Sequence, residues 1–465
     1  WERLFDSKLS GNQRVQLYTD AIERMYNNPN APTLFREIFK NSFLPFKDPP
    51  TLFMFIKEVN EFNYFHSEQL GDAYEYLLSF MGSQGEAGQF RTPRHIIDFV
   101  VSLLSPQKNE KILDPACGTA GFLISSYRNI IEENTKVKKG DRLSAEERKI
   151  LGENLNGYDI SPDMVRISLV NMYLHGFSNP LINEYDSLSD SSKWEQYFDV
   201  ILANPPFMTP KGGIIPHDRF SIKSKKAEVL FVDYILSHLK PSGRAAIIVP
   251  EGINFVGHKA YGEIRRNLLD QGLICDITLP HGVFKPYASV KTHILIINRE
   301  ISLKFDDVLF IEIDNDGFTQ SDTRQPVQGE QLSPALQIFK EYCSGGARNR
   351  SSDPIAICVS RKEIAESKDT HLIGRWYDLP SRIKRPNGVD ILPLQEICRI
   401  EKGASPNMNT PAGDYQMVVP APNFKTADRF DFEGKAVCIP LVSAAGHGKA
   451  DIKRLHFVEG KFALA

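Results

Sequence analysis

The sequence predicts an α/β fold whose central domain holds a doubly wound sheet of seven strands. Short apolar runs rich in β-branched residues alternate with helical patterns, which is typical of such a sheet. Three of the runs also end in an acidic residue, at the edge where open α/β sheets bind ligands. The seven runs cover residues 111–114, 155–160, 181–186, 198–203, 244–250, 273–280 and 292–298.

Composition limits the possible classes of protein. The chain has 465 residues, enough for roughly two to four domains. Its 55 basic and 58 acidic residues give a net charge of −3, so any contact with nucleic acid must be local. Six scattered cysteines without a CxxC pair indicate a reducing compartment and argue against a metal site. The chain contains no apolar run of about 18 residues, so we expect no membrane span.

Residues 1–88 are predicted to form an N-terminal helical domain. Ser67 can cap a helix whose apolar residues recur at a spacing of three and four. No catalytic constellation stands out here, which favours a packing or partner-binding module. The apolar face of that helix comprises Leu70, Ala73, Tyr74, Leu77, Leu78 and Met81.

The segment 89–94 precedes the first strand and begins another helix. Thr92 is predicted to be the N-cap residue and Pro93 the first helical residue. The free N–H groups at that end of the helix could hold a carboxylate. The alternative is a capped helix without further function. The segment comprises Gln89, Phe90, Arg91, Thr92, Pro93 and Arg94.

The first strand ends in Asp114 and is followed by a turn of small residues. Ala116, Gly118, Ala120 and Gly121 would let a ligand approach the backbone closely, although the turn is not a GxGxxG motif. Asp159, at the end of the second strand, can accept from both hydroxyls of a ribose, and Asp186 from an adenine amine. Each acid alone could equally be a helix-capping residue. Together they favour a nucleotide-like ligand.

The fourth strand is followed by a polar turn, Asn204-Pro205-Pro206-Phe207. The strand must stop at Asn204 because two prolines cannot continue a ladder. The Asn204 side-chain oxygen and the Pro205 carbonyl can accept both hydrogens of an exocyclic amine, which makes its nitrogen nucleophilic, and Phe207 can stack on the ring. This suits methylation of a planar amine. The alternative is a strand followed by a structural turn and a core phenylalanine.

Taken in order, these segments resemble the S-adenosylmethionine-dependent DNA adenine-N6 methyltransferases, specifically the modification subunits of type I restriction-modification systems. The resemblance rests on residues 70–77, 89–94, 114–123, 159, 186, 204–207 and 284–292. It implies a Rossmann-like methyltransferase domain with strand order 3-2-1-4-5-7-6. It also implies that a flipped adenine stacks on Phe207 and receives the methyl group directly. One departure is Arg91, where relatives usually carry an aromatic residue.

The resemblance assigns two sets of site residues and several partners. Asn204, Pro205, Pro206 and Phe207 are the catalytic set. The partners it implies are double-stranded DNA, a specificity subunit and a separate restriction subunit, in the cytoplasm of a prokaryotic cell. The residues expected to contact S-adenosylmethionine are Gln89, Phe90, Arg91, Thr92, Pro93, Arg94, Asp114, Thr119, Ala120, Gly121, Asp159 and Asp186.

Four regions follow from this interpretation: the helical domain 1–88, the methyltransferase domain 89–343, a linker or extension 344–390, and residues 391–465. Short strand-like runs at 416–419, 436–440 and 457–465 resemble the opening of a target-recognition domain of a type I specificity subunit. We therefore expect modification and specificity to be fused in one chain that stops partway through that domain.

Two other functions remain open. One is amine methylation on another acceptor: cytosine N4, RNA or a protein glutamine. Relatives that use glutamine usually carry Tyr in place of Phe207, and cytosine-N4 enzymes usually carry Ser-Pro-Pro-Tyr. The other is a non-catalytic DNA-binding scaffold, against which the intact Asn204 to Phe207 turn argues.

Overall fold

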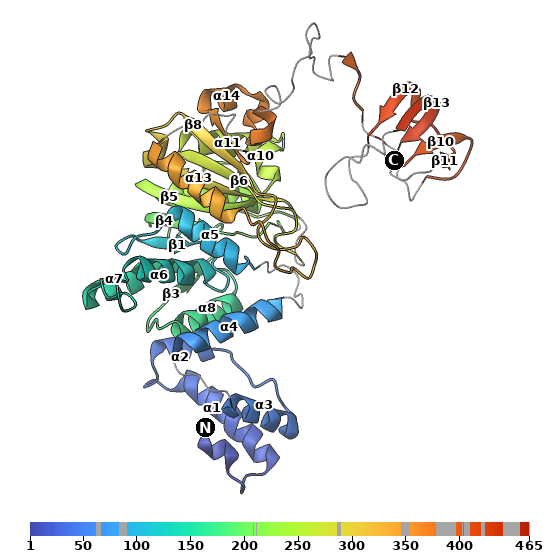
Figure 1. The fold of residues 1–465 in the computed structure, drawn as a ribbon. Coiled ribbons are helices and arrows are strands. Elements are labelled where there is room, and N and C mark those ends of the chain that lie inside the picture. Colours follow the sequence, from blue (N-terminus) through green and yellow to red (C-terminus); the bar gives the residue numbers. More distant parts are fainter. Residues whose placement is uncertain are drawn as a thin grey trace. The chain divides into compact units, whose positions relative to one another are not determined.

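The computed structural model describes residues 1–61, 67–82, 91–207, 209–210, 212–285, 290–345, 354–377, 397–401, 403, 410–419, 424–439 and 456–464. The chain divides into two compact units, Trp1–Pro380 and Ser381–Ala465 (Figure 1). No helix in the described part of the chain has both the length and the apolar character needed to span a bilayer.

The first unit is built on a nine-stranded sheet of order β3-β2-β1-β4-β5-β7-β6-β8-β9. β7 runs antiparallel to both β5 and β6, and β9 runs antiparallel to β8, whereas all other neighbours are parallel. The first seven positions confirm the predicted α/β class and strand order. The strands are β1 (Ile112–Asp114), β2 (Leu155–Asp159), β3 (Leu181–Glu184), β4 (Phe198–Ala203), β5 (Leu239–Pro250), β6 (Leu273–Thr278), β7 (Thr292–Asn298), β8 (Asp307–Glu312) and β9 (Ala356–Ser360).

The last two strands of this sheet were not predicted. β8 pairs with β6, and β9 pairs with β8 although it lies within the segment 344–390 that the sequence assigned to a linker or extension. Both strands are short apolar runs, whose pairing partner cannot be read from local pattern. The predicted domain boundaries at 88/89 and 343/344 stay predictions.

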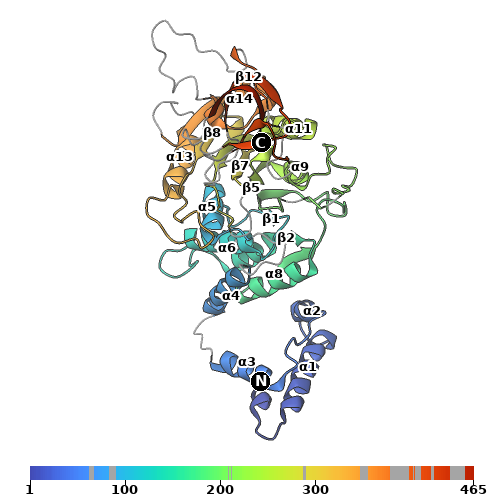
Figure 2. The same ribbon diagram turned by 90° about the vertical axis from the view of Figure 1, so that its right-hand side faces the viewer.

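Helices cover both faces of the sheet and create two apolar cores. Val200 and Leu202 of β4 belong to the core under α5 (Arg94–Leu104), α6 (Gly121–Glu133) and α13 (Leu332–Gly345). Ile201 and Ala203 belong to the core under α9 (Ala227–His238) and α11 (Lys259–Asp270). Successive side chains of β4 therefore point to opposite faces of the sheet, as in any pleated strand. Figure 2 shows α13 and α5 on one side of the strands and α9 and α11 on the other.

Several predicted element boundaries differ from the structure by one to a few residues. β2 ends at Asp159, and β3 ends at Glu184, two residues before Asp186. β5 begins at Leu239, five residues before the predicted run 244–250. The charged region after α6 contains α7 (Ala145–Asn154), which buries Leu151. The remaining short helices are α10 (Gly252–Phe255), α12 (Arg299–Ser302), α14 (Arg361–Glu366) and η2 (Lys368–Thr370).

The N-terminal part is helical, as predicted. Its elements are η1 (Glu2–Phe5), α1 (Gly11–Asn27), α2 (Thr33–Phe39), α3 (Pro49–Glu61) and α4 (Ser67–Gly82). Both α2 and α4 pack against α8 (Pro162–Leu174), which belongs to the central domain. Leu78 of α4 is buried, but Leu77 is 56% exposed, so the predicted apolar face is wrong at that position. The spacing of three and four residues placed Leu77 on the predicted apolar face, but α8 covers only part of that face.

The second unit contains a four-stranded sheet of order β11-β10-β13-β12. Three of its strands overlap the runs read from the sequence, and β11 was not predicted. The strands are β10 (Tyr415–Val418), β11 (Lys425–Ala427), β12 (Phe432–Cys438) and β13 (His456–Leu464).

Candidate active site

The polar turn that follows β4 lies at the carboxyl edge of the sheet. β4 runs to Ala203 between β1 and β5, and Asn204 is the first residue beyond it. The side-chain nitrogen Nδ2 of Asn204 donates to the hydroxyl oxygen of Thr92 over 2.7 Å. Its oxygen Oδ1 is buried and has no hydrogen-bond partner among the described residues. The turn therefore presents an unused acceptor at the sheet edge.

The predicted role of Thr92 as a helix cap is wrong. α5 begins at Arg94, Pro93 is its N-cap residue, and no side chain caps this end. The carbonyl of Pro93 accepts from the backbone N–H of Ile97 over 3.0 Å. Because the helix begins one residue later than predicted, Thr92 lies outside the cap position. Its hydroxyl is instead committed to Asn204, 112 residues further along the chain.

Phe207 lies at the end of the same turn and is partly buried. Its ring meets the ring of Phe284 edge to face, with centroids 5.6 Å apart and an interplanar angle of 89°. Phe284 is 1% exposed, so it forms a fixed support for Phe207. Pro205 is buried and Pro206 is exposed. Residues 286–289, part of the late segment on which the resemblance rests, lie outside the described residues.

The turn after β1 is open on one side. Gly118 has a φ of +54°, and among the described residues no atom beyond Gly118 and its two chain neighbours lies within 4 Å of the position that a Cβ there would take. Ala120 also adopts a left-handed conformation, at φ +64°, and α6 begins at Gly121 without a side-chain cap. A left-handed turn with open space is the close-approach geometry that the small residues predicted.

Side chains from two other elements, β2 and α8, hold this turn in place. The backbone N–H of Gly118 donates to Asp159 Oδ2 over 3.0 Å, and the Gly118 carbonyl accepts from the Ser168 hydroxyl. Asn171 Nδ2 donates to the Thr119 carbonyl over 2.8 Å. Ser168 and Asn171, both on α8, are positioning residues that sequence reasoning missed, because a polar residue within a helix carries no local signal of its partner.

Arg91 connects the segment before α5 to the same turn. Its guanidinium Nη2 donates to Thr119 Oγ1 over 3.2 Å. The residue that departs from the family pattern thus still lies at the predicted site. The neighbouring Gln89 and Phe90 lie outside the described residues.

Two of the predicted acids lie near the turn, Asp114 buried and Asp159 half-buried. Asp114 is 2% exposed, and burial raises the pKa of its carboxyl group to about 8, an effect that the hydrogen bond from Ala116 N opposes and the nearby Asp159 charge reinforces. Burial also raises the pKa of Asp159, although its two oxygens accept from Ser161 N over 2.9 Å and from Gly118 N. Each Asp159 oxygen makes one such bond and keeps a lone pair for a further donor.

Asp186 uses its carboxylate within its own turn. One oxygen accepts from the backbone N–H of Leu188 over 2.9 Å and of Ser189 over 3.2 Å, and the other accepts from the Ser189 hydroxyl. The alternative left open by the sequence was a helix-capping residue, but no helix is described between β3 and β4, and Asp186 caps a turn instead. Its contact with a cofactor stays a prediction.

Arg94 is engaged by acids on two helices. Its guanidinium pairs with Glu75 of α4 and, over 3.2 Å, with Asp98 of α5. The side chains of Asp72, Glu75 and His175 each offer one atom that could bind a metal ion, and these atoms lie within 4.8 Å of one another. The Arg128 guanidinium contacts Asp72, and it lies 2.7 Å from His175 Nε2. Arg128 thus supplies the positive charge in this cluster, which ties α4 to α6 and α8.

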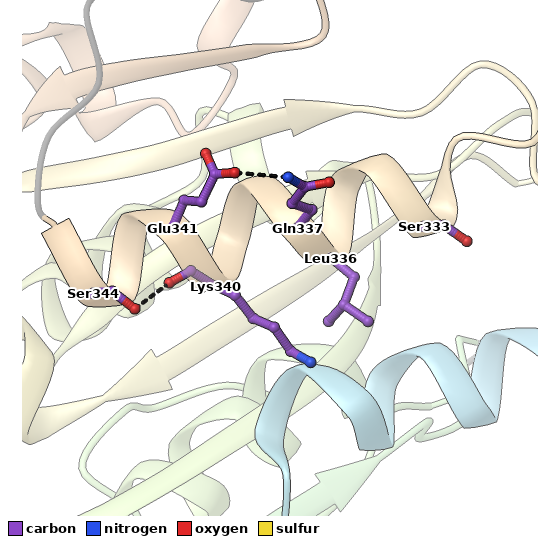
Figure 3. Close-up of a pocket in the computed structure, with 6 residues that line it drawn as sticks. All are labelled: Ser333, Leu336, Gln337, Lys340, Glu341 and Ser344. Carbon is purple, nitrogen blue, oxygen red and sulfur yellow. Dashed lines mark hydrogen bonds between the residues drawn. The ribbon is translucent and has the colours of Figure 1, made fainter.

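A surface hollow of about 440 Å³ lies along α13, away from these residues. All of its lining side chains come from that one helix, and two of them, Gln337 and Glu341, are joined by a 2.9 Å hydrogen bond (Figure 3). It contains no predicted site residue and no convergent polar groups from other elements, so it is not a candidate active site.

Comparisons with known proteins identify the family of the chain. The model of the family described as N-6 DNA Methylase matches residues 66–382. The EcoEI methylase subunit of a type I restriction enzyme of Escherichia coli is 29% identical over 63% of this chain. The EcoKI methylase subunit of E. coli K12 is 26% identical, and the match covers 87% of this chain and 80% of that one. These relatives confirm the resemblance drawn from the sequence.

Solved structures extend the agreement to the fold. A chain from a study of complex assembly and conformational transition of the type I R-M system superposes with a TM-score of 0.66 and 26% identity, covering 85% of this chain and 81% of that chain. The type I methyltransferase subunit of Streptococcus thermophilus, at 20% identity, has a TM-score of 0.62 over 80% of this chain and 78% of that one. The match spans 61% of the EcoEI subunit, less than two thirds of its length.

Proposed function

The chain belongs to the N-6 DNA methylase family, and we propose that it transfers a methyl group from S-adenosylmethionine to adenine N6 in DNA as the modification component of a type I restriction-modification system. The observation that carries this proposal is the buried, unpartnered Oδ1 of Asn204 at the end of β4. An acceptor in that position is what a planar amine needs to be captured at the sheet edge.

The turn supplies hydrogen bonds and position. Asn204 Oδ1 and the Pro205 carbonyl accept the two hydrogens of the adenine amine, which draws the nitrogen lone pair out of conjugation with the ring. Phe207, supported by Phe284, stacks on the base, which must first be extruded from the duplex. The protein accelerates the transfer by orientation and by electrostatic preorganisation, with no covalent intermediate.

The residues around the turn after β1 fit S-adenosylmethionine. The open space at Gly118 admits a ligand next to the backbone, and Asp159 keeps acceptor capacity for ribose hydroxyls. Arg91, Thr92 and the backbone of 119–121 would hold the rest of the molecule. When bound, this cofactor supplies a methyl group on a sulfonium that already carries its leaving group.

The partners follow from the relatives' names, which are those of type I restriction enzyme methylase subunits. Double-stranded DNA, a specificity component and a separate restriction subunit are the partners we propose, in the cytoplasm of a prokaryotic cell. We further propose that residues 391–465 begin a target-recognition domain fused to this chain, which the strands β10 to β13 support. The purified chain should then not cleave DNA unaided.

The test is base-resolved mapping of modified DNA from cells that carry the wild-type gene, the Asn204→Ala variant or no gene. We expect N6-methyladenine at one sequence motif with the wild-type gene only, because the variant cannot hold the amine. The variant should still bind cofactor, since that site lies on β1 and β2. Methylation of cytosine N4, or of no DNA base, would contradict the proposal, and so would a fully active Asn204→Ala variant.

A further inference from the structure

The hydrogen bond between Asn204 and Thr92 joins the two halves of the proposed active site. Asn204 belongs to the turn that captures the amine, whereas Thr92 belongs to the segment before α5 that lies beside the cofactor turn through Arg91 and Thr119. This 2.7 Å contact is the hydrogen bond that the structure gives to the Asn204 side chain.

The direction of this hydrogen bond decides whether the Asn204 amide can accept a hydrogen bond from the target amine. In the structure Asn204 presents Nδ2 to the Thr92 hydroxyl, so Oδ1 stays buried and unpartnered. If the amide rotated by half a turn about its last bond, its NH₂ would replace Oδ1. A donor would then face the donor hydrogens of the target amine, and no hydrogen bond could form.

A hydroxyl alone does not fix that direction, because it can either accept from an amide N–H or donate to an amide oxygen. The direction becomes unique once another acceptor takes the hydroxyl hydrogen, since the hydroxyl then offers Asn204 only its lone pairs. Thr92 lies two residues before the first residue of α5. A carboxylate bound at that end of the helix would be such an acceptor.

We propose that Thr92 is a positioning residue that couples cofactor binding to capture of the target base. When the carboxylate of S-adenosylmethionine accepts the hydrogen of the Thr92 hydroxyl, the amide of Asn204 is locked with Oδ1 towards the target amine. The cofactor-loaded protein therefore binds an extruded adenine more tightly than the cofactor-free protein does. By linkage, the base raises the affinity for the cofactor by the same factor. This inference rests on the proposed function.

The experiment measures this coupling directly, without turnover. The full chain, assembled with whatever specificity component it requires, is titrated with a duplex that carries 2-aminopurine beside the target adenine of the mapped motif. The titration is run with and without S-adenosylhomocysteine, which retains the carboxylate but has no methyl group to transfer. Base extrusion is read from the 2-aminopurine fluorescence.

Two variants separate the effect of the Thr92 hydroxyl from the effect of the side-chain volume. Thr92→Val keeps the shape and removes the hydroxyl, whereas Thr92→Ser keeps the hydroxyl. In the wild-type chain and in Thr92→Ser we expect S-adenosylhomocysteine to tighten base capture about tenfold, the usual worth of one neutral hydrogen bond. In Thr92→Val we expect this factor to fall below twofold. A Thr92→Val variant that keeps the full coupling overturns the inference.

A double-mutant comparison tests whether Thr92 acts through Asn204. In an Asn204→Ala background we expect Thr92→Val to leave the coupling unchanged, because the amide that it orients is absent. An equal loss in both backgrounds would overturn the inference. The proposed function fails separately, and visibly, if the wild-type chain methylates no adenine.

Discussion

The backbone N–H of Gly118 donates to the carboxylate of Asp159 over 3.0 Å, so the turn after β1 and the end of β2 form one structural unit. The same carboxylate accepts from Ser161 N, which begins the next turn of the chain. Asp159 therefore shapes the space in which a cofactor would lie, besides offering acceptors to it.

We expect Asp159→Ala to weaken binding of S-adenosylmethionine by about 2 kcal/mol or more, because a buried charged acceptor is lost. Isothermal calorimetry with the purified chain measures this change. Asp163→Ala on α8 is the matched control, since the Asp163 side chain is 73% exposed and pairs with Arg166. Affinity that stays at the wild-type value in Asp159→Ala would reject the assigned contact.

Phe207→Ala should weaken capture of the extruded base by about 1–3 kcal/mol, the usual worth of base–aromatic stacking. Phe207→Trp should keep partial activity because a ring is still offered. Single-turnover methyl transfer and 2-aminopurine fluorescence measure the two effects. Phe43→Ala, at a position that is 79% exposed in the N-terminal part, is the control. If Phe207→Ala instead abolished cofactor binding, its role would be structural.

A buried ion pair gives the chain a pH-dependent stability. His293 Nδ1 lies 2.7 Å from Asp276 Oδ1, and both residues are 1% exposed. Burial lowers the pKa of His293, but the adjacent Asp276 carboxylate outweighs this effect and raises that pKa to about 9. The pair's contribution to the free energy of unfolding is therefore complete below the ordinary histidine pKa of about 6.5 and is lost as the pH rises to 9.

We expect urea denaturation to report a decrease of up to about 3 kcal/mol in the free energy of unfolding between pH 6.5 and 9, relative to a His293→Asn variant. The variant should be less stable than the wild-type chain at pH 6 and should approach it at pH 9. His258→Asn, at an exposed position, should leave the wild-type profile intact. Parallel pH profiles for wild type and His293→Asn would disprove the prediction.

As the pH rises, ionisation of Asp114 should lower the stability of the folded chain, unlike that of an ordinary surface acid. With its pKa raised to about 8, the folded chain holds a proton on Asp114 that the unfolded chain has released. Stability contributed by this group is present at low pH and falls as the pH rises from about 4 to 8. Asp114→Asn cannot ionise, yet its side-chain oxygen can still accept from Ala116 N, the bond made by Asp114 Oδ1 over 3.1 Å.

Cofactor-free Asp114→Asn should therefore match the wild-type chain at pH 4 and exceed its stability at pH 8. Thermal denaturation at both pH values measures this difference. A variant less stable than the wild type at pH 8 would show that Asp114 is ionised in the folded chain.

The sequence by itself determined the sheet as far as its seventh strand and the position of the Asn204 turn at the carboxyl edge of that sheet. Both depend on short-range properties. A buried strand shows as an apolar run, and two prolines after Asn204 end a strand wherever it lies. The acids Asp114 and Asp159 were found for the same reason, since each ends an apolar run.

Tertiary structure alone decided which polar groups meet. The Thr92 hydroxyl could cap α5 or accept from Asn204, and only the approach of β4 to that segment settles the choice. β3 ends two residues before Asp186, so the Asp186 carboxylate accepts hydrogen bonds from its own turn. β8 and β9 joined the sheet by pairing, and Leu77 stayed exposed because no element among the described residues covers it. Hydrogen bonds, strand pairing and burial all depend on partners that are distant in sequence, so local pattern does not contain them.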